Sequence, residues 1–233
     1  MISAVVMLAA LSAAIYIGVQ QHALRARAEH LLADVRGFQL HGGTVADAQR
    51  IADNWERFAN VERKCDAQTC QIDIGVHDQI WVPQNAFRRI AVWSYWAVGW
   101  HETTARATIE ARNGTVDRTE FILMLDVPPY VSQVDRGGYG LFGRAVQQEE
   151  FGPYQFWPQR KLHPTYFIGK PGGCEGCIKL MTFSLPTTPP AKIEELTNFD
   201  LSCITRWFPC TTEADILPSA WKQYQAESGR GVE

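Results

Sequence analysis

The sequence has no excess of positive charge, since 22 Lys and Arg stand against 25 Asp and Glu, for a formal net charge of −3 at pH 7. An isoelectric point of about 6.1 leaves no basic field that would attract a phosphate backbone. We therefore expect no nucleic-acid partner. Aromatic residues, by contrast, are abundant at 11% of the chain, which argues against disorder.

Complete motifs of the common enzyme classes are also missing. His101 and Glu102 begin like the zinc-protease helix H-E-x-x-H, but Ala105 stands where the second imidazole ligand is needed. The chain contains no G-x-S-x-G elbow and no G-x-x-x-x-G-K-[ST] loop. Ile178 follows the C-x-x-C pair where haem attachment needs histidine. From these absences we expect no catalytic residues, no metal site and no cofactor.

Residues 2–19 lack charge, proline, asparagine and glutamine. As a helix, this run of about 18 residues would rise roughly 27 Å, close to the thickness of a hydrocarbon core. A buried helix of a soluble domain would normally carry a polar stripe, which this run does not. We predict a signal-anchor, transmembrane helix over residues 1–20, with cleavage near the small residues 12–14 as the alternative.

The charges that flank this run conflict with the cysteines over its orientation. Arg25, Arg27 and Arg36 follow the run, so the positive-inside rule would leave the C-terminal part in the cytoplasm. The paired cysteines instead favour an oxidising compartment. We give more weight to the cysteines and predict a single-pass protein of a bacterial inner membrane whose C-terminal domain is periplasmic.

The six cysteines form three close pairs in the sequence, which predicts three local disulfides that each rigidify a turn. One alternative gathers four thiolates of the last two pairs around a structural zinc, although six residues separate the final pair where two to four are usual. Another is thiol redox chemistry at the C-x-x-C pair, which a strand-like segment follows rather than a helix. The pairs are Cys65/Cys70, Cys174/Cys177 and Cys203/Cys210.

Periodicity predicts the N-terminal half of the fold. Residues 20–35 continue the anchor as a helix that ends at Gly37, and Thr44 then caps a second helix with Asp47 in its first turn. Residues 71–76 alternate as in a half-buried strand. Asn113-Gly114, between β-rich runs over residues 103–112 and 116–125, predicts a hairpin.

The remaining segments are predicted with less regular structure. Residues 127–171 are rich in Pro, Gly and aromatics, and we interpret them as a long ordered loop with short strands. Strand-like residues 165–168 and 178–185 flank the C-x-x-C pair, and short helices are predicted over residues 191–197 and 219–224.

Trp93, Trp96 and Trp100 recur at helical spacing within the apolar residues 86–100. The first interpretation is an aromatic core, because tryptophan buries a large area. The alternative is a platform on which sugar or peptide ligands stack.

Two segments carry a resemblance to a known group of proteins. LLADVRGFQLHGGTVADAQRIADNW, the cysteine pair that follows it, and DLSCITRWFPCTTEADILPSAWKQYQ together resemble uncharacterised membrane-anchored envelope proteins of acidobacteria. The resemblance covers residues 31–74 and 203–224 and leaves the middle of the chain uncovered. It implies an envelope location, and it transfers no functional residue because the group has no known activity.

These observations predict an α+β domain with a mainly antiparallel sheet and one or two packed helices, preceded by one transmembrane helix. Residues 1–20 form the anchor, 21–40 a juxtamembrane helix and linker, 41–218 the extracytoplasmic domain, and 219–233 a short helix and tail. The expected function is a non-catalytic interaction or structural module of the envelope, with a membrane and an envelope protein as partners. The alternatives are a carbohydrate or peptidoglycan binder, and a thiol-active or hydrolytic enzyme.

Overall fold

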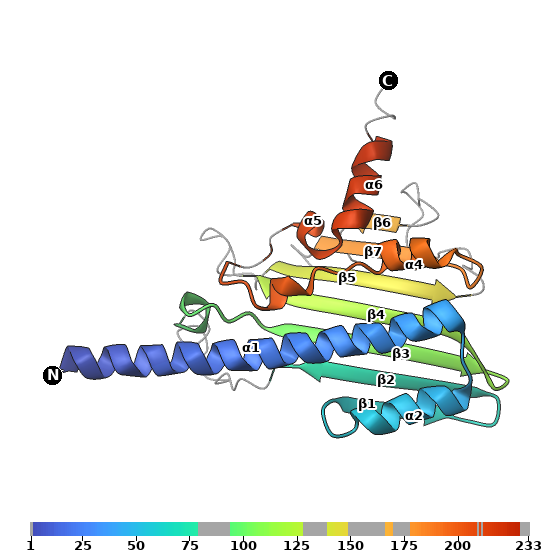
Figure 1. The fold of residues 1–233 in the computed structure, drawn as a ribbon, viewed down its shortest axis with the longest axis horizontal. Helices are drawn as coiled ribbons and strands as arrows, with labels where there is room; N and C mark the ends of the chain where they lie inside the picture. The colour runs from blue at the N-terminus through green and yellow to red at the C-terminus, as the bar shows by residue number, and fades with distance from the viewer. Residues whose placement is uncertain are drawn as a thin grey trace.

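The computed structural model describes residues 2–78, 94–127, 139–148, 166–169, 178–208, 210 and 212–228 (Figure 1). The helical elements are α1 (Ile2–His41), α2 (Val45–Trp55), α4 (Pro190–Leu196), the 3-10 helix η2 (Leu201–Ile204), α5 (Glu213–Ile216) and α6 (Pro218–Ser228). The strands are β1 (Asn60–Cys65), β2 (Thr69–His77), β3 (Thr103–Arg112), β4 (Thr115–Val127), β5 (Tyr139–Gln148), β6 (Tyr166–Gly169) and β7 (Ile178–Ser184).

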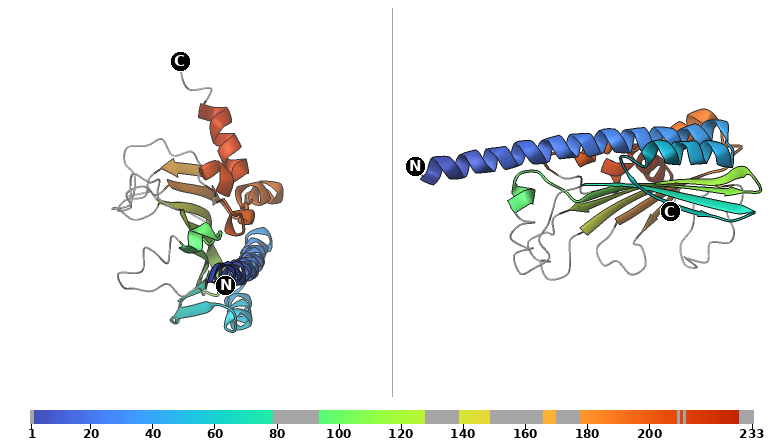
Figure 2. Two further views of the ribbon diagram at one scale, coloured as in Figure 1. Left: turned by 90° about the vertical axis from the view of Figure 1, so that its left-hand side faces the viewer. Right: turned by 90° about the horizontal axis from the view of Figure 1, so that it is seen from below.

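The strands form one seven-stranded sheet in the order β1-β2-β3-β4-β5-β7-β6. Among the strands that the structure describes, only β5 and β7 pair in parallel, so the prediction of an α+β fold with a mainly antiparallel sheet is confirmed. Helices α1, α2 and α4 lie on one face of the sheet (Figure 2). The interpretation of residues 127–171 as a loop with short strands is wrong where β5 runs, since β5 spans ten residues and lies between β4 and β7.

Local sequence signals are confirmed at two turns. Thr44 and Asp47 form a capping box at the start of α2, in which the Thr44 hydroxyl accepts from the Asp47 backbone N–H. Asn113 and Gly114 join β3 to β4 with φ angles of 51° and 89°, the left-handed conformation that a two-residue hairpin turn requires. Val45 N–H donates to the Gly114 carbonyl at 3.2 Å, which fixes the start of α2 against this hairpin.

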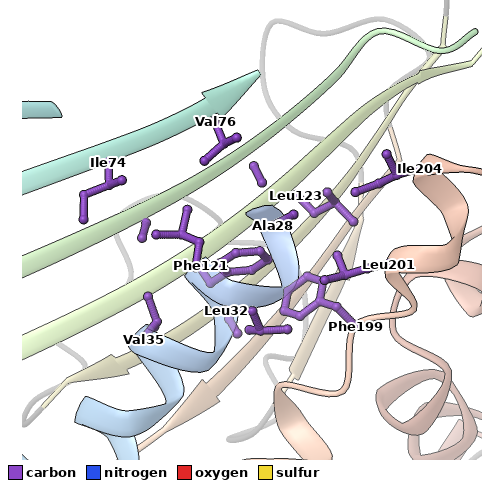
Figure 3. Packing of buried hydrophobic residues seen from close by; sticks show 14 of the residues in the cluster. Ala28, Leu32, Val35, Ile74, Val76, Phe121, Leu123, Phe199, Leu201 and Ile204 are labelled. Atoms are coloured by element: carbon purple, nitrogen blue, oxygen red, sulfur yellow. The ribbon is translucent and has the colours of Figure 1, made fainter. Parts of the chain in front are cut away.

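Helix α1 continues past Gly37 to His41, so the prediction that Gly37 ends it is wrong. It stops at Gly42, whose φ of 71° suits a helix C-terminus and whose N–H donates to the Phe38 carbonyl at 2.8 Å. The stretch predicted as a juxtamembrane helix and linker, residues 21–40, supplies core side chains that lie against the sheet (Figure 3). These are Leu24, Ala28, Leu31, Leu32, Val35 and Phe38.

The N-terminal half of α1 projects beyond the sheet (Figure 1). In this half of α1, Ile17 is buried at 2% exposure, and six large apolar side chains are exposed, namely Met7, Leu8, Leu11, Ile15, Tyr16 and Val19. Among the helix residues that the structure describes, no stretch reaches the length and hydropathy of a membrane span.

Candidate functional site

Trp100, one of the three residues of the alternative tryptophan platform, is buried. Its side chain is 1% exposed and its ring meets Tyr95 edge-on, with centroids 5.6 Å apart. A ring buried on all sides offers no face for a ligand, so Trp100 belongs to the core, as the first interpretation held. Trp96 is half-buried in a helical turn over residues 94–97, and Trp93 lies outside the described residues.

The segment that carries Trp100 is tied to α1 and to the C-terminal part of the chain. When the amide oxygen and nitrogen of Gln21 are exchanged so that both have hydrogen-bond partners, the nitrogen donates to the Gly99 carbonyl at 3.1 Å. The oxygen then accepts from the His101 N–H at 2.9 Å. The His101 Nε2–H donates to the Arg206 carbonyl at 2.8 Å. Burial lowers the pKa of His101, which keeps its imidazole neutral at pH 7. The hydrogen bond of His101 therefore connects the segment that carries Trp100 to the segment that carries Arg206.

An aromatic pair that the sequence interpretation did not single out lies exposed beside this segment. Trp207 is 56% exposed and Phe208 is 81% exposed, between the two cysteines of the last pair. Arg206 holds the loop by donating to Asp200 Oδ2 at 2.6 Å. Arg25 of α1 donates to Thr205 Oγ1 at 3.3 Å, so the loop lies next to the helix. The exposed pair could have been predicted from the sequence, because two adjacent aromatic residues, Trp207 and Phe208, lie between two closely spaced cysteines.

Two of the three predicted disulfides are confirmed, Cys65–Cys70 and Cys203–Cys210. Cys174 and Cys177 lie outside the described residues. Because Cys203 pairs with Cys210, the zinc alternative loses two of its four thiolates. Both sulfur-bearing side chains of this second bridge are buried, at 0% and 3% exposure.

Removal of the Cys203–Cys210 bridge should destabilise the protein. We expect Cys203→Ser with Cys210→Ser to lower the free energy of unfolding by about 2–3 kcal/mol, because the open loop gains entropy in the unfolded chain. Urea unfolding of both proteins, with and without reductant, measures the loss. Reductant should destabilise the wild type by at least this amount; an unchanged wild-type midpoint in reductant would contradict the bridge.

On the face of the sheet that α1 does not cover, two acidic side chains form ion pairs with arginines of neighbouring positions in the sheet. Asp73 is 5% exposed and accepts from Thr108 Oγ1 at 2.6 Å and from Arg106 Nη2 at 2.9 Å. Glu120 is 4% exposed and accepts from Arg118 Nη2 at 2.7 Å and from Arg144 Nη2. Both carboxylates thus have cationic partners within the sheet, which is the arrangement of a structural network.

A hollow of about 510 Å³ lies beside the Cys65–Cys70 bridge, at the sheet end that holds the β3–β4 hairpin. The Asn113 N–H donates to the Gln68 carbonyl at 2.8 Å, which joins the two turns at this end. Two hydrogen bonds from the Gln68 and Thr69 N–H groups lower the pKa of Asp66 in the first of these turns. The lining carries charges of both signs and includes Lys64, Asp66, Glu110, Arg112 and Asp117.

Comparison with protein-family models, with curated proteins and with solved structures gives no match.

Proposed function

We propose that the protein is a membrane-tethered, non-catalytic interaction or structural module of a bacterial cell envelope. Residues 1–20 insert in the inner membrane as a transmembrane helix, and the α+β domain lies on the periplasmic side. Envelope proteins are the expected partners.

Helix α1 is the observation that carries the proposal. One helix of 40 residues includes both the uncharged residues 2–19 and the side chains that fill the domain core. Six large apolar side chains between Met7 and Val19 are exposed, which is costly in water and favourable in lipid. Since no described linker interrupts α1, the anchor would hold the domain in a fixed orientation to the bilayer.

The arrangement of the polar groups supports a non-catalytic role. Asp73 and Glu120 are occupied in ion pairs, and His101 is neutral and bonded to a backbone carbonyl. Sugar stacking loses support at Trp100, which is buried, and at the hollow beside Cys65–Cys70, whose lining includes no aromatic side chain. The bridge Cys203–Cys210 is buried, which disfavours thiol exchange there.

Charged substitutions in the middle of the apolar run test the anchor. We expect Leu8→Arg with Leu11→Arg to release the protein from membranes, because each arginine near the centre of a span costs about 2.5–3.5 kcal/mol. Carbonate extraction of membranes, followed by detection of the full chain in pellet and supernatant, measures the release.

The matched control is Phe58→Arg, which charges another exposed apolar side chain outside the run and should stay in the pellet. A disulfide-dependent reporter fused after Glu233 tests the compartment, and it should be active. Wild-type protein in the carbonate supernatant would overturn the anchor, and an inactive reporter would overturn the periplasmic placement.

A further inference from the structure

We propose that the loop closed by Cys203–Cys210 lies on the bilayer and places Trp207 and Phe208 at the level of the lipid headgroups. The inference deepens the proposed function and rests on it, because it requires that residues 2–19 span the membrane. It assigns the exposed aromatic pair to lipid rather than to a protein partner.

The length of the apolar run leaves no spacer between the domain and the bilayer. Residues 2–19 rise roughly 27 Å as a helix, and a hydrocarbon core is roughly 30 Å thick. Burying the whole run therefore brings Val19 to the boundary of the core. Ile17, within the run, is already 2% exposed through contact with the protein, so the domain begins before the run ends.

Hydrogen bonds set the height of the aromatic loop along α1. Gln21 lies two residues after Val19, roughly 3 Å further along the axis, and bonds to Gly99 and His101. The Trp207 ring covers Gly99, since a Cβ built on that glycine would lie 3.1 Å from Trp207 Cε3. Trp207 is thus fixed beside the first turn of α1 beyond the apolar run.

Trp207 and Phe208 are residue types that suit a position at the membrane–water interface. Tryptophan concentrates at membrane–water interfaces, because its ring is largely apolar while its N–H needs a polar partner. Phe208, at 81% exposure, is the most exposed of the large apolar side chains that the structure describes. Tyr16 on α1, five residues before Gln21, is also exposed, at 55%.

The opposite end of the sheet provides an internal reference. Gln147 of β5 donates to the Gln39 carbonyl at 2.9 Å and is paired with Ser184 of β7. Gln39 lies 20 residues beyond Val19 on α1, roughly 30 Å along the axis. Leu185, next to Ser184 and 40% exposed, therefore lies far from the bilayer if the proposal holds.

Depth-dependent fluorescence quenching tests the proposal. Full-length protein is reconstituted in vesicles of phosphatidylethanolamine and phosphatidylglycerol, with or without lipid brominated near the top of the acyl chain. Phe208→Trp and the control Leu185→Trp each add one indole at an exposed site. We expect the emission added at position 208 to fall at least about twofold in brominated vesicles, and the emission added at 185 to stay unchanged.

The outcomes separate the two proposals. Protein that floats with the vesicles while its indole at position 208 is as unquenched as that at 185 overturns the lipid contact and leaves the anchor standing. A blue-shifted but unquenched indole at position 208 also overturns it and identifies a protein surface as the occupant. Protein that does not float with the vesicles overturns the proposed function itself.

Discussion

Replacing Phe121 with alanine is expected to lower the free energy of unfolding by about 3–5 kcal/mol. The side chain is 0% exposed and its ring meets Phe199 edge-on, with centroids 5.0 Å apart. It lies between β4, the α1 residues Ala28 and Leu32, and the segment that leads into η2 (Figure 3). Truncation would leave a cavity where three parts of the chain meet.

Urea unfolding of the full chain in a mild detergent, followed by tryptophan fluorescence, measures this loss. Met124→Ala is the matched control, because Met124 lies on the same strand but on the opposite face and is 38% exposed. It should cost about 1 kcal/mol or less. Equal losses for the two variants would contradict the assignment of the core to the face that α1 covers.

Sequence periodicity predicted α1 but not what α1 packs against. Leu24, Ala28, Leu31 and Val35 recur at helical spacing, and they do form one buried stripe. A stripe identifies the face of a helix that is buried and does not identify the surface that buries it. The position directly after an apolar run suggested a juxtamembrane segment, whereas the stripe packs on the sheet and belongs to the core.

The strand β5 was missed because its glycines weaken the strand pattern. Gly143 is required by packing, since a Cβ there would lie 2.5 Å from Ile216 and 2.8 Å from Phe199. Those two residues come from segments more than 50 positions later in the chain, which no local pattern includes. By contrast, the Thr44 cap and the Asn113-Gly114 turn depend on neighbouring residues only, and both were predicted.

At the candidate site, too, the sequence alone could not predict which tryptophans are buried and which are exposed. Trp100 and Trp207 are the same residue type, yet one is 1% exposed and the other 56%. Their spacing in the sequence does not distinguish the two environments, because exposure depends on which distant segments meet there. The cysteine pair around Trp207 was the more informative signal, since a short closed loop has little interior in which to bury its own side chains.

Replacing Glu120 with glutamine is expected to lower the free energy of unfolding by about 2–4 kcal/mol. The change keeps the shape of the side chain but removes the charge that Arg118 and Arg144 share. The two guanidinium groups are only 28% and 22% exposed, so water compensates each of them in part. This exposure places the expected loss below that of a fully buried pair.

A double-mutant cycle separates the ion pair from the shape of the site. Arg144→Met alone leaves Glu120 with one arginine, and in the double variant Arg118 still pairs with Glu110 at 2.9 Å. The double variant should therefore lose less stability than the sum of the two single changes. Glu62→Gln, which breaks an exposed pair with Lys64, is the control and should cost less than about 1 kcal/mol.

The same measurement bears on function. If Glu120→Gln unfolds like the wild type, the network does not stabilise the fold, and a buried carboxylate between two arginines would then need another reason, such as a bound ligand. If the loss is as large as expected, the charges on this face of the sheet are explained by folding. Among the surfaces that the structure describes, the polar hollow beside Cys65–Cys70 is then left for a protein partner, at the end of the domain opposite the aromatic loop that we assign to lipid.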